Sequence, residues 1–121
     1  MAEPIATEIT LRRQSRVLEV AFDDGRRFSL PFEYLRVHSP SAEVKGHGPG
    51  QEVLVLNKET VGIRAIEPIG QYAVKLVFDD GHDTGLYRWS YLYDLGRDQA
   101  KNDAAYRARV AAARAANAAG G

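Results

Sequence analysis

Cysteine is absent from this sequence, and its absence excludes several functions at once. Without thiols, the 121-residue chain cannot form disulfides, ligate an iron–sulfur cluster, build a thiolate zinc site or use a cysteine nucleophile. Long apolar runs are also missing, because no stretch approaches the roughly 18 residues of a membrane-spanning helix. The N-terminus lacks the basic and apolar regions of a signal peptide. We therefore expect a cytoplasmic protein that does not associate with membranes.

The sequence also lacks a surplus of charge of either sign. Lys plus Arg total 16 and Asp plus Glu total 16, so the formal net charge is zero. A protein without net positive charge has no long-range field that attracts polyanions, which argues against general nucleic-acid binding. Arg12, Arg13 and Arg16 lie close together and could form a local basic patch. A solvated strand edge is the simpler interpretation, and we expect no nucleic-acid partner.

What is present is the composition of one soluble globular domain, with 45% hydrophobic and 26% charged residues. Alternating apolar residues predict strands, and turn residues separate them. Pro31 is expected in the first turn of a short helix, and Pro68 with Gly70 is expected to end a strand. The predicted strands are 7–12, 17–22, 28–30, 53–56, 61–66 and 72–78. They predict an α+β fold of small antiparallel sheets built from β-hairpins with short helices.

Phe-Asp-Asp-Gly occurs twice, at 22–25 and 78–81, at an offset of 78 − 22 = 56 residues. Leu30 and Leu86 keep the same offset, and an aromatic-rich segment follows each copy. Asp-Gly between apolar runs is a strong hairpin signal, because glycine accepts the positive φ of a tight turn. The pattern predicts a strand, tight turn, strand and short helix twice. Coincidence is the alternative, since such hairpins are common.

The composition changes near the C-terminus, where 97–121 is rich in alanine. Alanine favours helix, but only Tyr106 and Val110 offer an apolar pair four residues apart. We therefore expect a compact domain over 8–96, followed by an Ala-rich tail that is a frayed helix or disordered. The last residues, 118–121, are expected to be disordered.

Aromatic residues crowd the segment that follows the second Asp-Asp-Gly. Tyr87, Trp89 and Tyr93 lie there with Arg88, and such residues are typical both of binding surfaces and of core packing. We assign Trp89 and Leu92 to the core. Tyr87, Arg88 and Tyr93 stay open between surface and core.

The chain has three histidines, His38, His47 and His82, and the first two share one Gly/Pro-rich loop with Glu43. Imidazole and carboxylate groups gathered in space would suit zinc or another borderline metal. Their spacing matches no established ligand pattern, and exposed loop histidines are the alternative.

A hydrolytic triad of His82, Asp83 and Ser90 is disfavoured. Ser90 lacks a Gly-x-Ser-x-Gly elbow, and adjacent residues on a strand point to opposite faces. No nucleophile is therefore evident from the sequence.

Three segments carry a resemblance to a known family: 22–36, 39–44 and 80–92. Through them the sequence resembles the bacterial stand-alone members of a family of unknown function related to the N-terminal domain of gamma-butyrobetaine hydroxylase. The likeness spans 8–96. It implies a small α+β module that holds zinc in the hydroxylases through a Cys-x-Cys-x-x-Cys segment and a later histidine. Those positions fall here on Ser39, Ser41, Val44 and His82. We expect no zinc and no other cofactor, because the thiolates are missing.

The resemblance also suggests a partner, since similar domains are attached to P-loop ATPases that carry iron–sulfur clusters. We therefore expect a non-enzymatic binding or adaptor domain with a protein partner, linked to iron–sulfur cluster assembly through such an ATPase. One alternative is a metal-binding protein that uses the three histidines and Glu43. Another is a structural unit that forms a homodimer. The predicted interaction surface consists of Arg36, His38, Ser39, Glu43, His47, His82, Tyr87 and Arg88.

Overall fold

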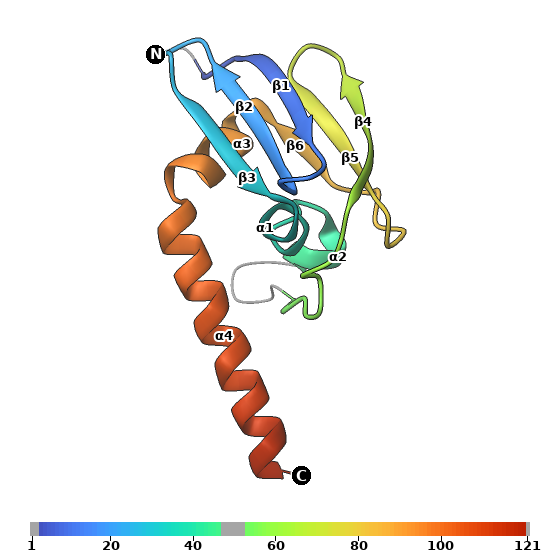
Figure 1. The fold of residues 1–121 in the computed structure, drawn as a ribbon, viewed down its shortest axis with the longest axis vertical. Helices are drawn as coiled ribbons and strands as arrows, with labels where there is room; N and C mark the ends of the chain where they lie inside the picture. Colours follow the sequence, from blue (N-terminus) through green and yellow to red (C-terminus); the bar gives the residue numbers. More distant parts are fainter. Residues whose placement is uncertain (1–2, 47–52, 121) are drawn as a thin grey trace.

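The computed structural model describes residues 3–46 and 53–120, which form two antiparallel sheets and four helices (Figure 1). The first sheet has the order β1-β2-β3 and the second the order β4-β5-β6. The strands are β1 (Ala6–Arg12), β2 (Val17–Phe22), β3 (Arg27–Pro31), β4 (Ile63–Ile69), β5 (Ala73–Phe78) and β6 (Leu86–Arg88). The helices are α1 (Phe32–Val37), α2 (Ala42–Lys45), α3 (Trp89–Arg97) and α4 (Gln99–Gly120). The predicted α+β fold of hairpin sheets and short helices is confirmed.

The predicted internal repeat is also confirmed. Each copy is a three-stranded meander followed directly by a helix, α1 after β3 and α3 after β6. The tight turns place Gly25 at φ 88° and Gly81 at φ 90°, in the left-handed region that glycine alone enters without strain. The first strand of each meander carries a register irregularity near its start. The two halves therefore share their turn geometry as well as their topology.

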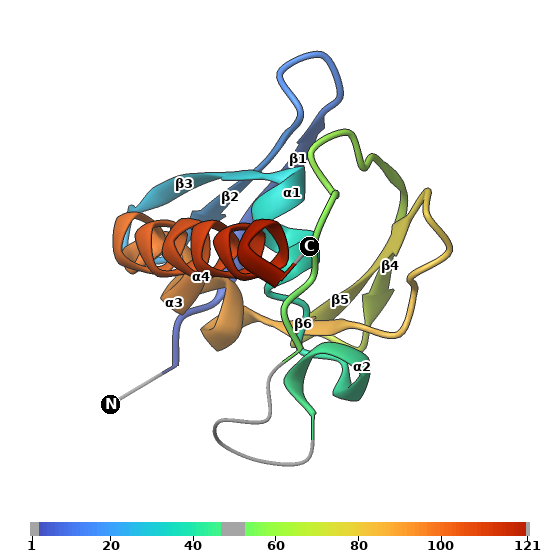
Figure 2. The same ribbon diagram turned by 90° about the horizontal axis from the view of Figure 1, so that it is seen from below.

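The core lies between the two sheets and is closed by α1 and α3. Period-two alternation on the central strands β2 and β5 directs alternate side chains inward. In Figure 1, α1 and α2 lie below the strands, while Figure 2 views the same elements from below and shows two separate sheets. The fully buried apolar residues with the largest side chains are Leu18, Leu30, Leu35, Ile63, Leu76, Phe78, Tyr87 and Leu92.

Two arginine side chains join the sheets across the gap between β1 and β4. Arg13 donates from Nη1 to the Ile63 carbonyl at 2.7 Å and from Nη2 to the Arg64 carbonyl at 3.2 Å. Arg16 donates to the carbonyl of Val61. Arg13 and Arg16 are exposed, as the interpretation of a solvated edge expects, and their guanidinium groups also bind backbone oxygens.

Three local predictions are corrected by the structure. Residues 53–56 contain no strand. β4 continues through Pro68 to Ile69, which is tolerated because β4 is an edge strand and proline lacks only a donor that such an edge does not need. Pro31 is the last residue of β3 and precedes α1, so it lies at the N-cap rather than inside the first turn.

The alanine-rich tail forms one continuous helix, α4, which is the helical one of the two outcomes expected for it. Its first half docks through the predicted pair, since Tyr106 and Val110 are buried against Val37 and the segment 54–56. Arg107 adds an ion pair with Glu33 at 2.6 Å. The second half extends away from both sheets (Figure 1). Disorder was predicted for 118–121, but the helix includes 118–120; residue 121 lies outside the described residues.

Candidate functional site

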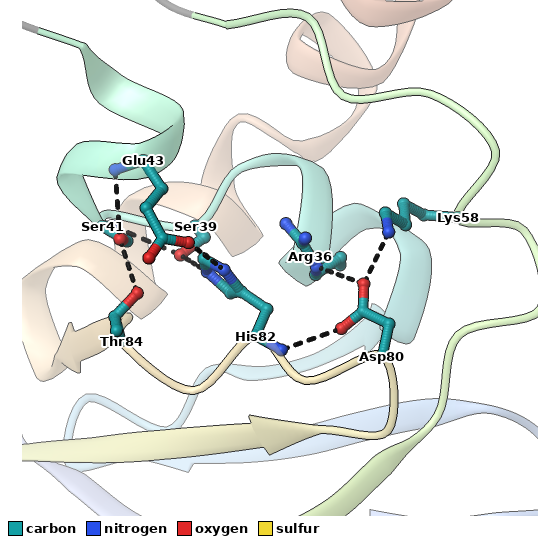
Figure 3. Close-up of polar contacts among 8 residues, drawn as sticks. All are labelled: Arg36, Ser39, Ser41, Glu43, Lys58, Asp80, His82 and Thr84. Carbon is teal, nitrogen blue, oxygen red and sulfur yellow. Dashed lines mark hydrogen bonds and ion pairs between the residues drawn. The ribbon is translucent and has the colours of Figure 1, made fainter.

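A buried polar cluster lies where the turn between β5 and β6 meets α2 (Figure 3). His82 and Ser39 are 5% and 0% exposed, and His82 Nε2 lies 2.8 Å from Ser39 Oγ. On the other side of the ring, His82 Nδ1 lies 3.1 Å from Glu43 Oε2. Glu43 itself is exposed and reaches the histidine from the protein surface. The cluster thus connects the surface to the core through three side chains.

The protonation of His82 follows from its neighbours. Burial lowers the pKa of His82 below 6.5, the Arg36 charge lowers it further, and Glu43 acts in the opposite direction. The ring is therefore neutral at pH 7. A carboxylate can only accept, so Nδ1 carries the hydrogen and donates to Glu43. Ser39 then donates its hydroxyl hydrogen to Nε2.

Ser41 positions the carboxylate of this cluster. Its side-chain oxygen caps α2 by accepting the Glu43 N–H at 3.2 Å, and it also lies 2.7 Å from the Thr84 hydroxyl. The Ser41 N–H donates in turn to Ser39 Oγ at 3.2 Å. Short polar side chains at the start of α2 therefore fix the helix against the segment before β6.

An ion-pair group centred on Asp80 adjoins the histidine. Asp80 accepts from Arg36 Nε at 2.9 Å, pairs with Lys58 Nζ at 2.7 Å, and accepts the His82 N–H at 3.2 Å. Burial acts to raise the pKa of Asp80, but the hydrogen bonds from Lys58, the His82 N–H and Arg36 outweigh it and lower the pKa to about 2. Asp80 is therefore ionised throughout the physiological range.

The order Ser39–His82–Glu43 has the connectivity of a hydrolytic Ser–His–acid triad. Catalysis requires a serine oxygen that substrate can reach, and Ser39 is fully buried. A Cβ on Gly85 would lie 2.4 Å from Ser39 Oγ, so the backbone of Gly85 packs directly on the hydroxyl. The arrangement stabilises the fold by satisfying buried polar groups, and the geometry does not admit nucleophilic attack.

Sequence reasoning grouped Glu43 with His82 only as a candidate metal cluster. It missed the hydrogen bonds of the ring to Ser39 and Glu43, because these residues lie 43 and 39 residues from His82. The disfavoured partners Asp83 and Ser90 make no hydrogen bond to the His82 ring in the described part of the chain. Two signals pointed here. The metal alternative grouped Glu43 with His82, and the resemblance placed Ser39 and His82 on ligand positions of one zinc site. The structure brings these two side chains into direct contact.

The residues at those positions do not fit zinc. Ser39 and Ser41 supply hydroxyls already engaged in hydrogen bonds, and Val44 supplies hydrocarbon. In the described ranges, no group of three or more His, Cys, Asp or Glu residues is placed to hold a metal ion. His38 turns to other partners, since its Nδ1 donates to the Tyr34 carbonyl at 2.9 Å. His47 lies outside the described residues, so the alternative metal site stays a prediction.

The predicted interaction surface divides by burial. Ser39, Tyr87 and His82 are buried, so none of them can offer its side chain to a partner without rearrangement. Arg36 is largely buried in its ion pair with Asp80. His38 is half-buried, while Glu43 and Arg88 are exposed. That this region recognises a partner stays a prediction.

The residues of the aromatic segment also differ in burial. Tyr87 is fully buried and donates its hydroxyl hydrogen to the Leu35 carbonyl at 2.6 Å, while Leu92 is in the core as predicted. Trp89 is only half-buried, so its assignment to the core is wrong in part. Tyr93 is half-buried as well.

Arg88 points away from the core beside two exposed apolar residues. Its guanidinium carbon lies 5.1 Å from the centre of the Tyr72 ring, and Tyr72 is 46% exposed. Leu86, two residues before Arg88, is 37% exposed and points to the same side of the sheet. We name Tyr72, Leu86 and Arg88 the β6 face.

The family model for the gamma-butyrobetaine hydroxylase-like N-terminal domain matches residues 9–93, and the chain belongs to that family. The chain is similar to two proteins with NMR solution structures. The first is 57% identical, with a TM-score of 0.80, and the match covers 92% of this chain and 83% of that one. The other is 46% identical, with a TM-score of 0.79 and coverages of 93% and 88%.

A third similar structure is the crystal structure of a protein of unknown function of the DUF971 family from Acidithiobacillus ferrooxidans. It is 41% identical, with a TM-score of 0.64, and the match covers 75% of this chain and 91% of that one. None of the curated proteins compared matches the chain significantly. Within the described ranges, no helix combines the length and the apolar character needed to cross a membrane.

Proposed function

We propose that this protein is a non-enzymatic adaptor domain whose protein partner docks on the β6 face. The observation that carries the proposal is the exposure of Tyr72, Leu86 and Arg88 together at one sheet edge, with Arg88 stacked on Tyr72 at 5.1 Å. Aromatic residues and arginine are enriched among the residues that contribute most to the binding energy of protein interfaces.

The strand pairing supports this choice of face. β6 is an edge strand of three residues, so Leu86 and Arg88 flank the buried Tyr87 and both point outward. Tyr87 anchors the strand in the core, and the outward residues are therefore held on a rigid backbone. The enclosed Ser39 supports a binding role over a catalytic one, since the one Ser–His–acid group found has no access to substrate.

The first partner to test is suggested by the family resemblance. Domains similar to this one are attached to P-loop ATPases that carry iron–sulfur clusters, so we propose an ATPase of that class as the partner. This protein would then bind the ATPase non-covalently, whereas the attached domains are covalently linked to theirs. Homodimerisation through the same face is the second candidate, since an exposed aromatic and arginine pair suits self-association equally.

Site-specific photo-crosslinking in the source cells tests the proposal. A photoreactive residue at position 88 is expected to capture one protein reproducibly, and the same residue at position 5 is not. Leu86→Glu should abolish capture while preserving the fold, because Leu86 lies opposite Lys75 across the strands and a glutamate there faces a cation.

Ile5→Glu is the matched control, since Ile5 is 51% exposed on the other half of the molecule. Capture that is equal from both positions, or that survives Leu86→Glu, would contradict the proposal. Capture of a second copy of this chain, with a sedimentation coefficient that rises with concentration, would replace the ATPase by the homodimer.

A further inference from the structure

Arg88 carries a charge that no carboxylate balances within the described residues. Its side chain is exposed, and its guanidinium carbon lies over the Tyr72 ring, 5.1 Å from the ring centre. A guanidinium group over a ring keeps the N–H groups at its edge for other partners. Those N–H groups match the two oxygens of a carboxylate. Arg88 is therefore arranged to receive a carboxylate from outside.

The other charges in the strands of the second sheet already compensate each other. Glu67 is the only carboxylate in β4, β5 and β6, and it pairs with Lys75 at 3.2 Å. The β6 face is therefore left with the positive charge of Arg88. A two-fold contact with a second copy would bring two such faces together, and their strands would supply no unpaired carboxylate. The apolar and aromatic contacts suit either candidate partner, but the charge favours a partner of different sequence.

The Tyr72 ring is held in place before any partner binds. A Cβ on Gly70 would lie 2.9 Å from Tyr72 Cε1, so the ring packs against the backbone of Gly70. Trp89 fixes the turn that carries Tyr72, because its Nε1 donates to the Gln71 carbonyl at 2.8 Å. The Trp89 backbone N–H donates to the Tyr72 carbonyl at 3.0 Å. A side chain that is already ordered loses less conformational entropy on binding, so this face is suited to specific recognition.

The first half of the molecule contains a similar pair whose carboxylate is supplied within the chain. The guanidinium carbon of Arg26 lies 5.7 Å from the centre of the Tyr93 ring. Asp24 lies beside both residues, since it accepts the Arg26 N–H at 2.9 Å and the Tyr93 hydroxyl at 2.7 Å. The pair of Arg88 and Tyr72 has no such neighbour among the described residues. The carboxylate that is internal in one half is therefore left for a partner to supply in the other.

We propose that the partner at the β6 face presents an Asp or Glu side chain next to an apolar side chain. Arg88 binds the carboxylate, and the apolar side chain packs on Tyr72 and Leu86. This inference rests on the adaptor proposal and adds the chemistry of the segment that the partner contributes. A phosphate group is a poorer match, because it carries close to two negative charges and the face offers one unbalanced cation.

Panning of a random peptide library on phage against the immobilised full chain tests the inference. The enriched peptides are expected to carry Asp or Glu beside an aliphatic or aromatic residue. Arg88→Glu should select Lys or Arg at that place instead. Arg26→Gln is the matched control, because it removes the arginine of the corresponding pair in the first half, and it should keep the acidic preference.

The affinity of one enriched peptide gives the size of the effect. The peptide is synthesised with both ends blocked, so that only side-chain carboxylates are present, and its binding is followed by fluorescence anisotropy. Replacing its acidic residue by the corresponding amide should weaken binding to the native chain about threefold to fivefold, the ratio that one partly exposed ion pair contributes. The same replacement should change nothing for the Arg88→Gln variant.

Three results would each overturn the inference: no enriched peptide, enrichment without acidic residues, or the same acidic preference from Arg88→Glu. The adaptor proposal is judged separately by crosslinking. Reproducible capture of one protein at position 88 supports that proposal even where the panning overturns the chemistry inferred for the partner.

Discussion

The two Asp-Asp-Gly turns are built alike but lie in different surroundings. In the first turn, Asp24 Oδ1 accepts the Arg26 N–H at 2.9 Å, and in the second, Asp80 Oδ1 accepts the His82 N–H at 3.2 Å. Arg26 is exposed at the surface, while His82 is buried against Ser39. The same local hydrogen bond therefore ends a solvated loop in one half and anchors a polar cluster in the other.

Most of the difference arises from chain that lies outside the repeat, and Arg36 of α1 adds to it. α2 and Lys58 belong to the connection between the two halves, and this connection covers only the second turn. The second carboxylate oxygen of Asp24, Oδ2, accepts the Tyr93 hydroxyl at 2.7 Å. The same oxygen of Asp80 accepts from Arg36 and pairs with Lys58. Local sequence thus determines turn geometry, and the long connection determines which turn becomes part of an interior site.

The largest effect is expected from removing the charge at the covered turn. Asp80→Asn should destabilise by about 2–3 kcal/mol, because Arg36 is mostly buried and would lose the one charged partner it has within the described residues. Asp24→Asn should cost clearly less, since that carboxylate is exposed. Urea unfolding of both variants measures the difference, and equal losses would mean that the cover over the second turn contributes nothing.

Substitution of either turn glycine should lower the stability by a similar amount. This comparison tests the turn geometry that the two halves share, independently of what surrounds each turn. Gly25→Val and Gly81→Val should each cost about 1–3 kcal/mol through backbone strain, because both residues have φ near 90°. The two costs should be similar, since a Cβ at either position meets no atom within 4 Å and adds no clash. Thermal unfolding of the two variants gives the comparison. An unchanged melting temperature for either one would show that its turn does not need a left-handed residue.

The smallest effect is expected from pH, and of the two turns only the one that contains His82 should show it. The pKa of His82 is lowered below 6.5, so its contribution to stability is present above pH 6.5 and is lost as the pH falls toward the folded-state value. His82→Gln should reduce the loss of unfolding free energy between neutral and mildly acidic buffer. Arg26→Gln, at the matching position, should leave that dependence unchanged.

The pKa of His38 is lowered as well, so this pH comparison is made in a His38→Gln background. If the unfolding free energy still depends on pH to the same extent when both histidines are replaced, other titrating groups cause the dependence.

The sequence was sufficient to predict the elements whose signals are local. Alternation and Asp-Gly turns predicted β2, β5 and both hairpins, because side-chain period and glycine φ depend on neighbouring residues alone. The continuation of β4 through Pro68 was missed, since whether a strand lies at an edge depends on the whole sheet. The sequence left α4 open between a frayed helix and disorder for a related reason, because its docking residues Tyr106 and Val110 find their partners far away in the chain.

The candidate site was less accessible to sequence reasoning. Triad partners of His82 were sought only among its neighbours Asp83 and Ser90, and Glu43 was considered only as a metal ligand, whereas tertiary folding supplies Ser39 and Glu43 from α2 and the segment before it. The burial of Tyr87 could be predicted only once β6 was known to be a strand with alternating faces. The outward Leu86 and Arg88 follow from the same alternation.

The arginine contacts between the sheets have a consequence for self-association. A strand edge with unpaired carbonyls is a template on which another chain can add a strand, and natural proteins guard such edges with charged side chains. Arg13 occupies the carbonyls of Ile63 and Arg64 at one end of β4. With these two carbonyls engaged, this end of β4 offers fewer acceptors to a strand that another chain could add.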